Sequence, residues 1–168
     1  MEKMKIAWQQ EAHSDKPLGL DWAPDSSHVV TCGMDTDAKI WKVQSGEMIT
    51  KFKDHQDLIR LCKWSPDGKW IASAAGAELK IWEPFSGQAW MSINSQNGQF
   101  EALEWSNSGK VICTGHNDGS VTRRDLILES SRLVEIARNR IVRDLTTDER
   151  SDFRLPQTLV SVTDRQII

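Results

Sequence analysis

Several features that mark particular classes of protein are absent from this 168-residue sequence. Its formal net charge is only −3, which gives no electrostatic reason to expect nucleic acid or an anionic membrane as a partner. No apolar run approaches the roughly 20 residues that a membrane-spanning helix needs. The N-terminus lacks the apolar core of a signal peptide. We therefore expect a soluble, cytoplasmic protein that neither binds nucleic acid nor inserts into a membrane.

Cysteine is also scarce. Cys32, Cys62 and Cys113 are odd in number and widely spaced, and none belongs to a Cys-x-x-Cys pair. This pattern argues against a disulfide framework and against a zinc site. Each cysteine lies in an apolar, strand-like run, so we expect buried, reduced thiols. Nothing in the sequence predicts a metal or another cofactor.

Lysine and tryptophan both disappear toward the C-terminus. All eleven lysines and all eight tryptophans lie at or before residue 110. After residue 122 there are nine arginines against eight acidic residues, so the segment is not a polybasic tail. The shift marks a degenerate repeat, a change of partner surface or a segment of different origin.

The sequence does contain a repeat. The segment that begins Trp22-Ala-Pro-Asp-Ser-Ser recurs as Trp64-Ser-Pro-Asp-Gly-Lys and again, at a nearly equal spacing, as Trp105-Ser-Asn-Ser-Gly-Lys. Its second half, Ala38-Lys-Ile-Trp41, returns as Leu79-Lys-Ile-Trp82 and then, degraded, as 121–124. A period of about 41 residues with strand-like units indicates a stacked repeat architecture.

Turn residues divide each unit into four short antiparallel strands. Asp-Gly and Asn-Gly dipeptides suit the hairpin turns, because glycine accepts positive φ without steric cost. The strands are expected at 18–22, 29–32, 38–43 and 47–53; at 59–64, 70–74, 78–83 and 88–93; and at 100–105, 111–114, 120–125 and, more weakly, 132–137. A helix over residues 129–138 is the alternative to that last strand.

The two ends of the chain suggest a closure. Residues 4–10 are predicted as an outermost strand, and 141–145, 158–162 and 165–168 as three inner strands. We expect residues 4–9 to pair with 163–168, within one chain or between two. The alternative is that the chain is a fragment whose open edges meet other units.

These repeats resemble those of the WD-repeat family, whose four-stranded blades form β-propellers. The resemblance covers residues 11–125 well and 126–168 poorly. The family's repeating set is a His before the first strand, a Ser or Thr on the second, an Asp in the next turn and a Trp on the third. The matching residues are His13, Thr31, Asp35 and Trp41; His55, Ser73 and Trp82; and Thr114 and Asp118. Gly76 replaces the second Asp, Arg124 replaces the third Trp, and no His precedes the third unit.

The resemblance implies an all-β fold of WD-repeat propeller blades, with three clear repeats and one degenerate repeat. They would lie at residues 11–53, 54–93, 94–137 and 138–168 of a single propeller-type domain, either four-bladed or part of a larger ring. Two finer resemblances stand beside it. The order of the units is similar to that in a WD-repeat subunit of the intraflagellar transport B complex. Gly19-Leu-Asp-Trp-Ala-Pro and Val30-Thr-Cys-Gly-Met-Asp are similar to the WD-repeat subunit of the Arp2/3 complex. These would associate the protein with the cilium or the cytoskeleton.

The expected function is that of a non-catalytic scaffold. The His-Asp-Ser set recurs with the period of the repeat, whereas a catalytic site would have no reason to recur in this way. The sequence also lacks a nucleophile elbow. A propeller-scaffold enzyme, the alternative, would need carboxylates or metal ligands that converge on the central channel. The partners would be other proteins in a multisubunit complex, or a second copy that closes a larger propeller. The candidate partner-binding residues are Asp15, Lys16, Thr36, Asp37, Gln56, Asp57, Ala77, Glu78, Asn97 and Asn117, with Trp70 and Trp90 as candidate aromatic anchors.

Overall fold

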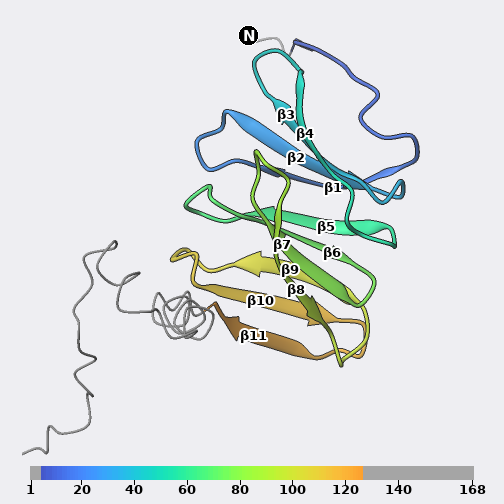
Figure 1. Ribbon diagram of the computed structural model, residues 1–168, viewed down its shortest axis with the longest axis vertical. Coiled ribbons are helices and arrows are strands. Elements are labelled where there is room, and N and C mark those ends of the chain that lie inside the picture. The colour runs from blue at the N-terminus through green and yellow to red at the C-terminus, as the bar shows by residue number, and fades with distance from the viewer. Residues whose placement is uncertain (1–4, 127–168) are drawn as a thin grey trace, which may run out of the picture. The chain divides into compact units, whose positions relative to one another are not determined.

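The computed structural model describes residues 5–126, which form eleven strands and, within that range, no helix. Accordingly, no helix of the described residues could span a membrane. Figure 1 shows the strands gathered into separate sheets. The strands are β1 (Pro17–Trp22), β2 (His28–Gly33), β3 (Ala38–Lys42), β4 (Met48–Phe52), β5 (Ile59–Trp64), β6 (Ile71–Ala75), β7 (Glu78–Trp82), β8 (Ala89–Asn94), β9 (Phe100–Trp105), β10 (Val111–His116) and β11 (Val121–Asp125).

These strands form three antiparallel sheets, one for each repeat. The first sheet has the order β1-β2-β3-β4, the second β5-β6-β7-β8, and the third β9-β10-β11. The all-β expectation is therefore confirmed for the described residues, and every strand expected between residues 18 and 125 is present. The strands expected at 132–137, 141–145, 158–162 and 165–168 lie outside the described residues.

One turn position recurs in all three sheets. The turn after each inner strand places its fourth residue beyond the tryptophan in the left-handed region: Ser26 at φ 60°, Gly68 at 72° and Gly109 at 67°. Each of these residues donates its backbone N–H to the carbonyl three positions earlier, at 2.8–2.9 Å. Glycine adopts this conformation without a Cβ penalty, whereas serine carries some strain there. The repeat therefore fixes the backbone even where the residue type has changed.

The core lies between neighbouring sheets rather than within one of them. Inner strand β5 packs against β1 and β2, and β9 packs against β5 and β6. Phe52 at the end of β4 stacks on Trp82 of the second sheet, with ring centroids 4.6 Å apart and planes parallel to 1°. Both side chains are almost fully buried. Each sheet thus buries its face only because another sheet covers it.

The N-terminal segment lies beside the first sheet without pairing with it. Residues 5–10 form no strand with the described residues. Instead the Trp8 indole N–H donates to the carbonyl of Val43 at 2.6 Å, and its ring packs against Gly46 in the β3–β4 turn. The segment is held by a side chain rather than by backbone pairing. Its expected partner, 163–168, lies outside the described residues.

The three cysteines differ in their burial. Cys32 and Cys62 are buried between the first and second sheets, as expected, whereas Cys113 on β10 is exposed. The face of the third sheet that carries Cys113 has no further sheet on it within residues 5–126. The expectation of three buried thiols is therefore wrong for Cys113.

The stacked pair of Phe52 and Trp82 supports a first prediction. We expect Phe52→Ala to lower the free energy of unfolding by about 3–5 kcal/mol, because it empties a site shared by two sheets. Phe85→Ala is the control, since this side chain is 56 % exposed and should cost less than about 1 kcal/mol. Urea denaturation measures both values. Similar losses for the two variants would contradict an inter-sheet core.

Candidate functional site

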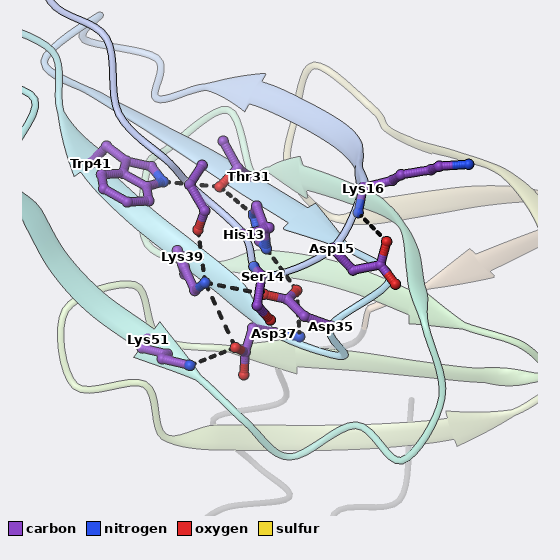
Figure 2. Close-up of polar contacts among 11 residues, drawn as sticks. His13, Ser14, Asp15, Lys16, Thr31, Asp35, Asp37, Lys39, Trp41 and Lys51 are labelled. Carbon is purple, nitrogen blue, oxygen red and sulfur yellow. Dashed lines mark hydrogen bonds and ion pairs between the residues drawn. The ribbon is translucent and has the colours of Figure 1, made fainter.

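The most connected polar site of the described residues lies in the first repeat. His13 precedes β1, Thr31 lies on β2, Asp35 in the β2–β3 turn and Trp41 on β3 (Figure 2). His13 Nδ1 is 2.7 Å from Asp35 Oδ1, and His13 Nε2 is 2.8 Å from Thr31 Oγ1. The Trp41 indole N–H donates to Thr31 Oγ1 at 2.9 Å. The structure therefore brings the four residues of the first set into one chain of hydrogen bonds.

The donors in this chain can be assigned from its two ends. An indole N–H can only donate and an ionised carboxylate can only accept. Thr31 therefore accepts from Trp41 and donates its own hydrogen to His13 Nε2, which leaves the His13 Nδ1–H to donate to Asp35. Every member is satisfied, and the side chains of His13 and Asp35 are 0 % and 5 % exposed. A satisfied buried network of this kind fixes the segments that contribute to it.

Asp35 gathers further donors. Its Oδ2 accepts from Lys39 Nζ at 3.1 Å and from the Ser14 backbone N–H at 3.2 Å. Lys39 Nζ also donates to the carbonyl of Ala12 at 2.7 Å, which ties the segment before β1 to β3. Burial raises the pKa of Asp35, but the hydrogen bonds from His13 and Lys39 outweigh it and hold that pKa at about 2. Asp35 is therefore an anion at any physiological pH.

The second repeat keeps the hydroxyl and loses the turn carboxylate. Ser73 Oγ accepts from the Trp82 indole N–H at 3.1 Å and lies 2.8 Å from His55 Nε2. Gly76 takes the Asp position at φ 55°, and a Cβ built there would lie 2.9 Å from Asp57 Oδ2. His55 Nδ1 consequently makes no hydrogen bond within the described residues, although Glu78 Oε2 lies 3.3 Å away. Burial lowers the pKa of His55 despite that carboxylate.

The third repeat forms a similar network from other residues. Arg124 Nη1 donates to Thr114 Oγ1 at 2.6 Å, in the role that the tryptophan has elsewhere. His116, at the end of β10, places Nε2 3.1 Å from Thr114 Oγ1 and Nδ1 3.0 Å from Ser95 Oγ. The sequence reasoning missed His116 and Ser95, because it looked for a His before the first strand. The histidine two positions after Thr114 was the available signal.

Asp118 is a correction to the expected set. It is exposed, and its carboxylate accepts from the Ser120 backbone N–H at 2.8 Å within its own turn. No hydrogen bond joins it to Thr114 or His116 in the part of the chain that is described. The Ser120 hydrogen bonds lower the pKa of Asp118. His116 Nδ1 lies 3.0 Å from Ser95 Oγ instead, so this imidazole is already engaged away from the Asp118 carboxylate.

Most candidate partner-binding residues surround these networks. They lie at the same end of their sheets as the networks. Some come from the segments before β1, β5 and β9, and the others from the second turn of each sheet. The exposed ones are Asp15, Lys16, Gln56, Asp57, Ala77, Asn97 and Asn117, and we call this set the tetrad rim. Thr36 and Glu78 are only half-exposed.

Asp37 is a second correction. Only 7 % of this residue is exposed, and its carboxylate pairs with Lys51 at 2.5 Å and with Lys39 at 3.7 Å. Two lysines on the same sheet therefore occupy the group that a partner would have to reach (Figure 2). We exclude Asp37 from the tetrad rim.

The two candidate aromatic anchors contact each other instead of standing apart. The rings of Trp70 and Trp90 lie 5.1 Å apart with planes tilted by 32°. Trp70 packs against the core between the second and third sheets, and Trp90 on β8 is 38 % exposed. Neither residue lies in the tetrad rim. This contact indicates that both side chains serve in the packing of the second sheet.

The chemistry open to the networks is limited. The Thr31 hydroxyl both accepts and donates in its chain, and it is buried. No cluster of three or more His, Cys, Asp or Glu side chains within residues 5–126 is arranged to hold a metal ion. These hydroxyl–imidazole pairs are therefore suited to holding turns in place.

Comparison with known proteins agrees with this geometry. The family model described as "WD domain, G-beta repeat" matches residues 5–42 and 46–83. The match identifies two WD40 repeats in the first half of the chain. The antiparallel sheets of the described residues are consistent with blades of that type. The comparison does not confirm the finer resemblances to intraflagellar transport or Arp2/3 subunits.

The chain is also similar in sequence to parts of two curated proteins. The chain is 29 % identical over 129 residues to "Periodic tryptophan protein 2 homolog" of Caenorhabditis elegans, which covers 75 % of the chain and 13 % of that protein. It is 27 % identical over 118 residues to "WD repeat-containing protein 90" of Xenopus tropicalis, which covers 65 % of the chain and 6 % of that protein. The chain thus spans a small part of the length of either relative.

The unequal networks lead to a second prediction. We expect Asp35→Ala to lower the free energy of unfolding by about 1–3 kcal/mol, because the buried His13 and Lys39 then lose an acceptor. Asp118→Ala should cost less than about 1 kcal/mol, since it removes one exposed turn hydrogen bond. Urea denaturation of both variants tests the contrast. Equal costs at the two sites would show that Asp35 is not part of a buried network.

The lowered pKa of Asp35 supports a third prediction. Its pKa is about 2 in the folded protein, against about 3.9 for an unfolded aspartate. A depressed folded pKa stabilises the protein fully above the unfolded pKa, and this contribution is lost as the pH falls through the folded pKa. Wild type should therefore exceed Asp35→Asn in stability by a constant margin above about pH 5, and by a shrinking margin from about pH 4 to pH 2. Denaturation at several pH values measures the margin, and a margin independent of pH would contradict the assignment.

Proposed function

We propose that this protein is a non-catalytic scaffold that binds partner proteins through the tetrad rim. The observation that carries the proposal is the buried network beneath that rim. In the first repeat the network joins the segment before β1 to the β2–β3 turn through His13 and Asp35. Loops held in one conformation lose little entropy on binding, so they recognise a partner at low ordering cost.

The exposed groups of the rim suit a polar partner surface. Asp15 and Asp57 accept backbone N–H groups in their own turns through Oδ1, at 2.7 Å each, which fixes their side chains. Asn117 likewise accepts from the Gln99 N–H at 3.0 Å, and Asn97 donates to Ser120 at 3.2 Å. The rim therefore offers preordered carboxylates and amides rather than a large apolar patch. Such groups fix register and specificity in an interface.

The assembly is the finer part of the proposal. The names of the two relatives describe WD-repeat or periodic-tryptophan proteins, and WD repeats are interaction modules. We propose a subunit role in a multisubunit complex, with a ciliary transport or cytoskeletal complex in the cytoplasm as one setting that the order of the repeats supports. A second copy that closes a larger propeller is the alternative partner. We also propose that the blades belong to one propeller-type domain of four or more blades.

A charge reversal confined to the rim tests this function. We expect Asp15→Lys with Asp57→Lys to remove partner proteins from an affinity purification out of the native cells, with the melting temperature kept close to that of wild type. The matched control is Asp25→Lys with Asp67→Lys, which changes the net charge equally in the turns at the opposite end. Those two aspartates also accept backbone N–H groups, from Ser27 and Lys69. Unchanged partners in the rim variant, or an equal loss in the control, would contradict the proposal.

A further inference from the structure

A cavity lies between the first and second sheets, at the end opposite to the tetrad rim. Its volume is about 220 Å³, and the turns that follow β1, β5 and β7 line it. We call it the turn cavity. The side chains that determine its chemistry are Pro24, Asp25, His28, Trp64, Asp67 and Phe85.

Contacts between the two sheets hold the walls of this cavity. The Thr50 hydroxyl on β4 of the first sheet donates to the carbonyl of Phe85 at 3.2 Å. The Phe85 ring meets the His28 ring edge to face, with centroids 5.4 Å apart. Pro24 lies against the turn after β5, since a Cβ built on Gly68 would be 3.8 Å from the proline ring. The cavity is therefore a built feature of the two sheets rather than a gap between free loops.

The two carboxylates of the cavity are preordered. Asp25 Oδ1 accepts from the Ser27 backbone N–H at 2.9 Å and from the Ser27 hydroxyl at 2.7 Å. Asp67 Oδ1 accepts from the Ser65 hydroxyl at 2.6 Å and from the Lys69 backbone N–H at 3.2 Å. The Ser27 hydrogen bonds lower the pKa of Asp25, and the Ser65 and Lys69 hydrogen bonds lower the pKa of Asp67 despite its partial burial. Both groups are therefore anions at physiological pH.

Each carboxylate keeps one oxygen for a ligand. Asp25 Oδ2 accepts no hydrogen bond within residues 5–126. Asp67 Oδ2 has only the exposed Lys69 ammonium near it, at 3.9 Å. The Oδ1 atoms fix the side chains and the Oδ2 atoms remain available to accept.

His28 supplies a third acceptor. The Ser27 hydroxyl donates its hydrogen to Asp25, so it must accept from His28 Nδ1, which lies 2.6 Å away. The neutral imidazole then carries its lone pair on Nε2. Asp25, His28 and Asp67 thus all present acceptors, and a ligand of this cavity must be rich in donors.

Trp64 has the opposite need. It is 6 % exposed, and its indole N–H makes no hydrogen bond within the described residues. The corresponding indole of Trp105 donates to the carbonyl of Lys63 at 3.2 Å. A buried donor without a partner is rare in folded proteins. It indicates a ligand that brings an acceptor together with its donors.

One kind of group meets both requirements. No group of three His, Cys, Asp or Glu side chains in the described part of the chain is arranged to hold a metal ion, so an organic cation is the better match. A guanidinium presents five donors in a plane and stacks on aromatic rings, and Phe85 offers a ring that is 56 % exposed. The peptide that carries an arginine also brings backbone carbonyls for the indole. We propose that the turn cavity binds an arginine side chain of a partner protein, at a site separate from the tetrad rim.

An arginine peptide tests the site on the full chain. The probe is Gly-Arg-Gly with both ends blocked, and matched peptides carry lysine or citrulline in the central position. Citrulline keeps the shape of arginine without its charge. We expect the arginine peptide to shift the Trp64 indole N–H signal saturably in a two-dimensional NMR spectrum, and to bind about three- to tenfold more tightly than the lysine peptide. The citrulline peptide should produce no saturable shift.

Substitutions at the cavity identify the groups that bind. Asp25→Asn and Asp67→Asn should each weaken binding of the arginine peptide about three- to tenfold, because each removes one charge and keeps an acceptor for its own turn. Phe85→Ala should weaken it through the lost ring. Asp57→Asn is the matched control, because it makes the same charge change on a preordered carboxylate of the tetrad rim, and should bind like wild type. Melting curves check that each variant is folded.

The outcomes at the two sites are distinguishable. The proposal is overturned if the Trp64 signal does not respond to the arginine peptide, if the citrulline peptide binds equally, or if Asp57→Asn weakens binding as much as the cavity variants. In the affinity purification, the double lysine variant at Asp25 and Asp67 should keep the proteins that the rim variant loses, and should release only a protein held by its arginine. Failure at the turn cavity therefore leaves the test of the rim unchanged.

Discussion

The arrangement of this protein depends on a hydroxyl buried on the second strand of each sheet. Thr31, Ser73 and Thr114 each accept one hydrogen bond from a long side chain on the third strand and lie within bonding distance of an imidazole. In the first two sheets the imidazole comes from the segment before the first strand, so one hydroxyl ties together parts of the chain that are far apart in sequence. The turns at that end of the sheets take their positions from these bonds. The buried hydrogen bonds therefore hold the exposed loops of the tetrad rim in place.

The packing between sheets adds the second level of order. A single sheet of this chain has one strand face that it cannot bury alone, and the neighbour buries it through Phe52 on Trp82 or Leu103 on the second sheet. Stability is then shared between adjacent sheets, as in other repeat proteins. The same logic explains why Cys113 and Leu20 are exposed although their equivalents are buried. Their environment is set by the neighbouring sheet and not by their own strand.

Much of this arrangement could be predicted from the sequence. The repeat period, the turn glycines and the recurring tryptophans predicted the strands between residues 18 and 125, because each of these signals is local. The His13, Thr31, Asp35 and Trp41 set followed from the resemblance to WD repeats. Substituted members were harder to predict. His116 comes from a different strand than expected, and Asp118 keeps the family spacing but turns to its own backbone. Both outcomes depend on which side chains lie close enough in space to form hydrogen bonds, and the spacing of residues in the sequence does not encode that.

The third network shows how freely the partners of that hydroxyl can change. An arginine stands in for an indole, and a histidine from β10 stands in for one that precedes the first strand. The hydroxyl itself has no such freedom, because it must act as donor and acceptor in the same small volume. Valine has the shape of threonine but can neither donate nor accept a hydrogen bond. Across the three sheets the position of this hydroxyl is therefore always serine or threonine, and the positions that contact it vary.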